Sequence, residues 1–279
     1  MRSGFVTLVG RPNVGKSTLV NALCGQKVSI VSDKPQTTRT CVRGVLTRPD
    51  VQLVFVDTPG LHKPVTALGD RVNATALDSV NDVDAVCLVI DGTKPFGTGD
   101  QWVAGRFDVS QAIVVINKID AINKTRLIGQ LSAASSLEAA AYFPLSAKTG
   151  EGVGEFVDHL AALMPDGPLL FPDDVVRELP EEQWIAELVR EQLLAVTHDE
   201  LPYSIATRVT EWDWPRVRCE IIVERDSQKG MVIGKHGAVL KEVGSRVRAQ
   251  LPEGIYIELF VKVDKDWQRR PDRVERLGY

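Results

Sequence analysis

The chain has 279 residues, of which 44% are hydrophobic and 25% charged, with a formal net charge of −4. This size and composition are typical of a globular protein of about two domains. No apolar run approaches the ~20 residues that span a bilayer, and the four cysteines form no close pair, which argues against a membrane-embedded protein, a disulfide framework or a zinc site.

The first part of the chain, residues 1–164, alternates short apolar runs with helical patterns. Continuous β-branched runs are typical of buried, mostly parallel strands, so this part is predicted to be a doubly wound α/β domain. We expect strands at Phe5–Val9, Cys41–Leu46, Val51–Val56, Ala85–Ile90, Ala112–Ile116 and Tyr142–Leu145, and helices at Lys16–Cys24, Leu68–Ser79, Gln101–Phe107, Lys124–Leu137 and Val153–Leu163.

Residues 165–182 are rich in proline and acidic residues and show no periodicity, so we expect a semi-extended linker there. Residues 183–279 are predicted to form a smaller α+β domain. Its expected elements are a helix at Gln183–Val196, strands at Tyr203–Glu211 and Val217–Glu224, a loop at Gly230–Gly237, a helix at Ala238–Gln250 and a strand at Ile255–Val263.

A phosphate-binding pattern lies between the first predicted strand and helix. Gly10-Arg11-Pro12-Asn13-Val14-Gly15-Lys16-Ser17 fits G-x-x-x-x-G-K-[ST] in the strand–turn–helix context that this pattern requires. Backbone N–H groups of such a loop surround phosphates, its lysine reaches the β- and γ-phosphates, and its serine ligates Mg²⁺. We expect nucleotide contacts from Gly10 through Thr18.

Two further segments are predicted to sense the γ-phosphate. Asp57-Thr58-Pro59-Gly60 ends a strand, where Asp57 would hold Mg²⁺ through water and the Gly60 N–H would meet the phosphate. Gln36-Thr37-Thr38-Arg39-Thr40 is the expected first switch. One of its threonines would close on Mg²⁺, and Thr38 is the favoured one.

The base-reading loop is predicted at Asn117-Lys118-Ile119-Asp120, with Ser146-Ala147-Lys148 completing the pocket. The Asp120 carboxylate can accept hydrogen bonds from guanine N1–H and N2–H₂. Adenine lacks that donor pair, so a buried carboxylate facing it would be left unpaired. The motifs therefore indicate a GTPase of the translation-factor type that binds GTP and GDP.

Two positions bear on the hydrolysis rate. Leu61 stands where Ras-like GTPases carry a water-orienting glutamine, which predicts slow turnover; the following His62 is more often an ordinary loop residue than a catalytic one. In potassium-activated GTPases a phosphate-loop asparagine at the place of Asn13 helps to hold K⁺. Asn13 would do the same here, or would only stabilise the loop.

The second domain carries a GxxG loop, Gly234-Lys235-His236-Gly237, before a helix. Its surrounding order of elements matches a KH module, in which such a loop clamps single-stranded RNA. By itself the loop would read as a helix-entry turn. Residues 227–279 carry eleven Lys and Arg against seven Asp and Glu, a local excess of +4. Trp267 would either stack on a base or pack in the fold.

The chain as a whole resembles the Era family of bacterial ribosome-assembly GTPases. The resemblance rests on Gly10–Thr18, Gln36–Thr40, Asp57–Pro64, Asn117–Asp120 and Ser146–Lys148, together with Lys229–Gly237. It implies a GTP-bound form that binds the 3′ end of small-subunit rRNA and assists maturation of the 30S ribosomal subunit.

We expect a monomeric cytoplasmic protein and leave open a peripheral association with the cell membrane. The alternative is a GTP-dependent switch whose C-terminal domain docks a protein partner instead of RNA. RNA-binding activity separates these two functions.

Overall fold

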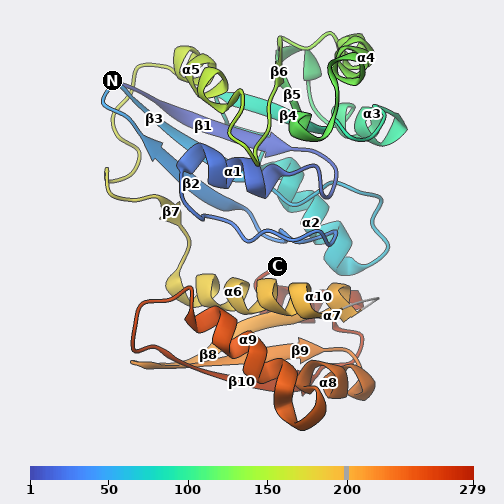
Figure 1. Cartoon of the computed structure of the whole chain (residues 1–279), viewed down its shortest axis with the longest axis vertical. Coiled ribbons are helices and arrows are strands. Elements are labelled where there is room, and N and C mark those ends of the chain that lie inside the picture. Colours follow the sequence, from blue (N-terminus) through green and yellow to red (C-terminus); the bar gives the residue numbers. More distant parts are fainter. Residues whose placement is uncertain (198–200) are drawn as a thin grey trace. The chain divides into compact units, whose positions relative to one another are not determined.

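The computed structural model describes residues 1–197 and 201–279 (Figure 1). These residues form two compact units. The first unit consists of Met1–Val31, Thr38–Pro64 and Gly69–Glu178, and the second of Ser32–Thr37, Val65–Leu68 and Leu179–Tyr279. Within the described residues, no helix is both long and apolar enough to cross a bilayer.

The first unit is built on a seven-stranded sheet with the strand order β6-β5-β4-β1-β3-β2-β7. Pairing is parallel except that β2 runs antiparallel to β3 and β7. The strands are β1 (Arg2–Val9), β2 (Val42–Thr47), β3 (Val51–Asp57), β4 (Ala85–Asp91), β5 (Ile113–Asn117), β6 (Ala141–Pro144) and β7 (Arg177–Glu178). The register pairs Leu8 with Asp57 and Asp91 with Asn117, so the polar residues that end these strands share one edge.

Helices cover both faces of this sheet, which confirms the doubly wound α/β prediction (Figure 1). One face packs against α1 (Lys16–Cys24) and α5 (Val153–Leu163). The other packs against α2 (Ala67–Asp78), α3 (Thr98–Ala104) and α4 (Lys124–Ala134). Along β4, Cys87 and Val89 join the first core while Leu88 and Ile90 join the second. Alternation between two buried faces explains why such strands read as continuous apolar runs.

The second unit has a three-stranded sheet in the order β10-β9-β8, with β9 and β10 parallel and β8 antiparallel to β9. In β9, Val217 and every residue from Cys219 to Val223 are buried, and α6 packs on β8 and α9. The elements are α6 (Glu181–Val196), α7 (Leu201–Ser204), β8 (Ala206–Asp213), β9 (Arg216–Val223), α8 (Asp226–Ile233), α9 (Ala238–Arg248), β10 (Tyr256–Val263) and α10 (Pro271–Arg276).

Several predicted elements differ from the structure in their bounds, three of them for identifiable local reasons or in kind. The helix expected at Gln101–Phe107 is α3, which begins earlier, at Thr98, because the Asp100 carboxylate accepts a hydrogen bond from Gly97 N. The strand expected from Tyr203 begins at Ala206, after the short helix α7. The loop expected at Gly230–Gly237 is helical through Ile233, because α8 continues through Gly230.

Part of the segment expected as a linker is held by the first unit. The buried Gln52 amide on β3 donates to the Phe171 carbonyl at 2.9 Å and accepts from Leu170 N at 2.7 Å and Phe171 N at 2.9 Å. Further along, β7 pairs with β2. A buried amide needs hydrogen-bond partners, and this part of the chain supplies them with its backbone.

Candidate functional site

The phosphate loop of the sequence analysis connects β1 to α1. Gly15, at its end, has φ 97°, and a Cβ there would lie 2.4 Å from Nδ2 of Asn117, so only glycine fits. The Lys16 ammonium curls back over the loop and donates to the carbonyls of Gly10 and Arg11 at 3.2 Å each. Burial lowers the pKa of Lys16 to about 8, opposed by the charge of Asp57. The Lys16 ammonium thus lies beside the backbone that would surround a phosphate.

Three oxygen-bearing side chains meet at the start of α1. Ser17 Oγ lies 2.8 Å from Thr38 Oγ1, which donates to Asp57 Oδ2 at 3.4 Å. Asp57 is fully buried, and its Oδ1 has no hydrogen-bond partner among the described residues. Burial raises the pKa of Asp57, against the charge of Lys16 and hydrogen bonds that include those of Ser17 and Thr38. A carboxylate with an orphaned oxygen beside two hydroxyls fits the oxygen ligands that Mg²⁺ prefers.

The choice among the switch threonines follows from their contacts. Thr38 faces Ser17 and Asp57, whereas the Thr37 hydroxyl donates to the Lys34 carbonyl at 2.6 Å. Thr38 is therefore the threonine whose hydroxyl lies in the oxygen cluster.

The segment after β3 is fastened to the phosphate loop. Thr58 Oγ1 donates to the Leu8 carbonyl at 2.6 Å, and buried Pro59 follows it. A Cβ at Gly60 would lie 2.7 Å from the Cα of Pro12, so this position requires glycine. The Leu61 side chain is 1% exposed and packs in the core between the sheet and α2–α4, so it offers no polar group to the site. His62 Nδ1 lies 3.1 Å from the Gly60 carbonyl.

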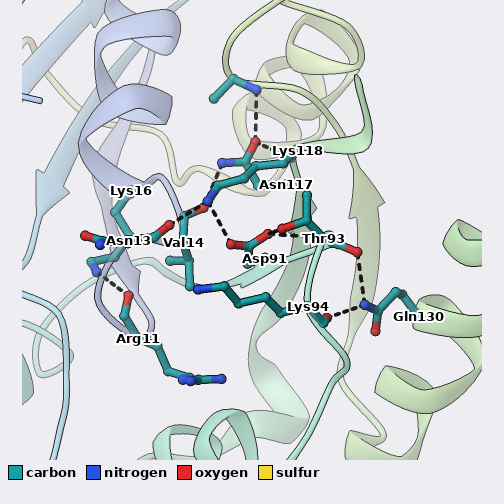
Figure 2. Close-up of polar contacts among 12 residues, drawn as sticks. Arg11, Asn13, Val14, Lys16, Asp91, Thr93, Lys94, Asn117, Lys118 and Gln130 are labelled. Carbon is teal, nitrogen blue, oxygen red and sulfur yellow. Dashed lines mark hydrogen bonds and ion pairs between the residues drawn. The ribbon is translucent and has the colours of Figure 1, made fainter. Parts of the chain in front are cut away.

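The loop after β5 joins the phosphate loop to the loop after β6 (Figure 2). Asn117 Nδ2 donates to the Val14 carbonyl at 3.0 Å, while its Oδ1 accepts from Lys118 N at 2.8 Å and Ala147 N at 3.0 Å. Asp120, which is exposed, accepts a hydrogen bond from Ser146 Oγ at 2.7 Å.

Lys148 and Arg11 are two further residues of the predicted site. Lys148 is exposed. Arg11 of the phosphate loop pairs with Asp100 at 3.4 Å. Taken together, the structure brings the segments Gly10–Thr18, Asp57–Gly60, Asn117–Asp120 and Ser146–Lys148 to one edge of the sheet.

The sequence analysis missed Asp91 at this edge. Asp91 ends β4 beside Asn117 of β5, and its carboxylate pairs with the Lys118 ammonium at 2.7 Å (Figure 2). The signal that could have revealed it is its position, since an acid directly follows a buried apolar strand whose neighbours also end in motif residues.

The GxxG loop lies in the second unit, between α8 and α9. Gly234 has φ 73° and ψ 172°, and a Cβ there would lie 2.5 Å from Val239 Cγ2. Gly237 has φ 76° and ψ 15°, the left-handed conformation, at the N-cap of α9. Lys235 and His236 between them are exposed. A tight turn thus presents a cationic side chain and a helix N-terminus together.

The tryptophans do not take part in this loop. Trp267 is fully buried and donates from Nε1 to the Ser204 carbonyl at 3.0 Å, so base stacking by Trp267 was the wrong alternative and packing is its role. In the hairpin between β8 and β9, the rings of Trp212 and Trp214 stack with their centroids 6.4 Å apart and remain 38% and 60% exposed.

Comparison with known proteins matches both units. Residues 5–118 match the family described as 50S ribosome-binding GTPase, and residues 200–268 match the KH domain family. The chain is 45% identical to the GTPase Era of Mycobacterium avium (strain 104) over 295 residues, covering 100% of this chain and 99% of that protein. It is equally similar, at 45% over 296 residues, to the GTPase Era of Mycobacterium tuberculosis (strain H37Rv), covering 99% of this chain and 98% of that protein.

Two solved structures cover the whole chain. One is Era in complex with MgGDPNP and nucleotides 1506–1542 of 16S ribosomal RNA, with a TM-score of 0.96, 38% identity and coverage of 100% of this chain and 99% of that one. The other is an Aquifex aeolicus Era variant bound to GDP and AlF₄⁻, with a TM-score of 0.94, 38% identity and the same coverage. Both the fold class and the predicted resemblance are confirmed, and the chain belongs to the Era family of GTPases.

Proposed function

We propose that this chain is a GTP-hydrolysing switch that binds the 3′ end of small-subunit rRNA and assists maturation of the 30S subunit. The observation that carries the proposal is the pairing of a complete guanine-nucleotide edge with a GxxG turn in a KH unit. The Era relative whose structure holds 16S rRNA nucleotides and MgGDPNP supports the same pair of ligands.

The nucleotide lies along the loops that end β1, β3, β5 and β6. The backbone from Gly10 to Thr18 surrounds its phosphates, with the α1 N-terminus and Lys16 supplying positive charge. Asp120 accepts from the guanine donors, and Ser146 keeps that carboxylate in place. Asn117 holds the base loop against the phosphate loop, so base and phosphates are bound by one connected structure.

The oxygen cluster Ser17, Thr38 and Asp57 would hold Mg²⁺. When bound, this ion neutralises part of the phosphate charge that develops during transfer. Thr38 belongs to the first switch, so the bond between its hydroxyl and that of Ser17 brings switch and phosphate loop together. Gly60 brings its backbone N–H toward the γ-phosphate, because it approaches the phosphate loop more closely than any side chain would allow.

Turnover is slow and rises in K⁺. Leu61 is buried in the core, so the side chain after Gly60 cannot orient the attacking water. Asn13 has φ 65° at the tip of the phosphate loop, where an amide oxygen would help to hold a monovalent cation near the transferring phosphate.

RNA binds at Gly234, Lys235, His236 and Gly237. The two glycines permit close approach of an RNA backbone, while Lys235 and the N-terminus of α9 favour its phosphates.

Sequencing of crosslinked RNA tests this function. The protein is held with a non-hydrolysable GTP analogue in a cell lysate, crosslinked with ultraviolet light, and its RNA is sequenced; Lys16→Ala protein is the nucleotide-binding control. We expect reads concentrated at the 3′ end of small-subunit rRNA and depleted in the control. Reads spread evenly over all RNA, with a protein co-purifying at equal stoichiometry, would support the protein-docking alternative.

A further inference from the structure

Asp91 uses both of its carboxylate oxygens at the nucleotide edge. Oδ2 pairs with the Lys118 ammonium at 2.7 Å. Oδ1 accepts from Thr93 N at 2.9 Å and from Thr93 Oγ1 at 2.6 Å, which closes a turn after β4 (Figure 2). The Asp91 side chain is 6% exposed, so it is committed to these two partners and not to solvent.

The Lys118 side chain crosses from the base loop to the phosphate loop. Its ammonium also donates to the Asn13 carbonyl at 2.7 Å, and its backbone has φ 68° and ψ 35°, the left-handed region. A lysine stem has four flexible carbons and normally samples many rotamers. Here one carboxylate and one carbonyl, from two different loops, fix the end of that stem.

We propose that Asp91 is a positioning residue for guanine nucleotide binding, acting through Lys118. By anchoring the ammonium, Asp91 holds the Lys118 stem along the base pocket and braces the base loop against Asn13 of the phosphate loop. The inference rests on the proposed function, because Lys118 belongs to the guanine-reading loop.

Asp91 is ionised at neutral pH. Burial by itself would raise the pKa of Asp91, but the hydrogen bonds from Lys118 and Thr93 outweigh it and leave the pKa below its ordinary value. The β4–β5 register, which sets Asp91 opposite Asn117, places this carboxylate beside the loop that it supports.

Asp91→Asn separates the two tasks of the carboxylate. The amide oxygen can still accept from Thr93, whereas its NH₂ group would face the Lys118 ammonium with a donor against a donor. We expect fluorescent GDP to dissociate about 10-fold faster, a factor that corresponds to ~1.4 kcal/mol of binding free energy. The factor should be equal for GDP and a GTP analogue, because Lys118 supports the base and not the γ-phosphate.

A double-mutant cycle tests whether the effect passes through Lys118. Lys118→Met keeps the apolar stem and removes the ammonium. In that background Asp91→Asn should change GDP affinity by less than about twofold, whereas a merely structural role would cost the same factor in both backgrounds. Asp158→Asn, which removes an exposed ion pair with Arg48 far from these contacts in sequence, should leave dissociation unchanged.

The outcomes are distinct. If Asp91→Asn binds GDP like the parent, or is equally harmful with Lys118→Met, the inference is wrong although the parent remains a guanine-nucleotide protein. A parent that does not prefer GDP over ADP would instead contradict the proposed function. Should Asp91→Asn not fold, Asp91→Ser keeps an acceptor for Thr93 without the charge; failure of both to fold would show that Asp91 serves the fold alone.

Discussion

Single side chains in the nucleotide site hold loops together as well as face the expected ligand. Asn117 uses three of the four hydrogen-bonding positions of its amide to join the phosphate loop, its own loop and the loop after β6. Asp120 is exposed and yet fixed by Ser146. The carboxylate that we propose as the reader of the base is therefore oriented by the protein itself.

Changing Asp120 should change which base is bound. Asp120→Asn keeps an acceptor for Ser146 but presents an NH₂ group where guanine has its own amine. We expect GTP affinity to fall about 100-fold or more and xanthine nucleotide affinity to rise, since xanthine carries an acceptor there. Equilibrium dialysis with GTP and with xanthine nucleotide measures the two affinities. Equal affinity of the parent for ATP and GTP would refute the assignment.

The ion pair of Asp91 should also appear in stability against pH. An unfolded aspartate titrates near ~3.9, and the folded pKa is lower. The contribution of the ionised Asp91 to the free energy of unfolding is therefore fully present above pH ~4, and it is lost only as the pH falls through the folded pKa. We expect Asp91→Asn to cost about 1 kcal/mol in urea unfolding, equally at pH 7 and pH 5. If the loss of unfolding free energy is already halved at pH 5, then burial outweighs the hydrogen bonds and the pKa of Asp91 is raised in the folded protein.

At the scale of elements, short connections after the strands carry the chemistry while the sheet and helices fix their places. The phosphate loop leaves β1 and opens α1, and it receives hydrogen bonds from Asn117 and Lys118 as well as from its own Lys16. Backbone held in this way is preorganised to surround phosphate with its N–H groups.

The phosphate loop should make turnover sensitive to the monovalent cation. Replacing KCl with NaCl at constant ionic strength is expected to lower GTP turnover several-fold, because Asn13 would hold K⁺ beside the phosphates. Phosphate release is the measurement, and Asn13→Ala should abolish the difference. Matched rates in the two salts, or a K⁺ preference that survives in Asn13→Ala, would rule out this role.

The GxxG turn should tolerate alanine substitution of its glycines far less well than the helix α8 before it. Gly234→Ala combines a positive φ with a Cβ 2.5 Å from Val239 Cγ2, so we expect a loss above about 2 kcal/mol. Gly237→Ala meets open space and should lose only ~1 kcal/mol through its φ. Gly230→Ala, inside α8 with nothing within 4 Å, should gain up to ~1 kcal/mol.

Urea unfolding followed by tryptophan fluorescence reports these changes, since Trp184, Trp212, Trp214 and Trp267 all lie in the second unit. If Gly234→Ala and Gly237→Ala are equally mild, the turn is not held in the conformation described.

For the whole molecule, the sequence predicted those features that have a local signature. Strands that end in motif residues, the phosphate loop and the order of elements in the second unit could all be read from spacing and periodicity. The contacts of Gln52 with Phe171 and of Asp91 with Lys118 could not, because they join residues 119 and 27 positions apart without any repeating pattern. The α8 helix was missed because Gly230 reads as a loop residue, although the helix tolerates it.

The chain joins a guanine-nucleotide unit to a KH unit for which we propose RNA binding. The exposed residues Lys235 and His236 allow the proposed RNA binding to be tested without changing the nucleotide site. Changing both residues to Asp places carboxylates where RNA phosphates should lie, and like charges at such distances repel by several kcal/mol at an effective dielectric near ~20.

The deciding measurement is filter binding of a single-stranded oligonucleotide from the 3′ end of small-subunit rRNA to the GTP-analogue complex, at fixed salt. The Lys235→Asp, His236→Asp double variant should bind at least about tenfold more weakly than the parent, which needs only ~1.4 kcal/mol. Its GTP hydrolysis without RNA should match that of the parent. Undiminished RNA binding by the folded double variant would contradict RNA binding at the GxxG turn and leave that turn as a helix entry.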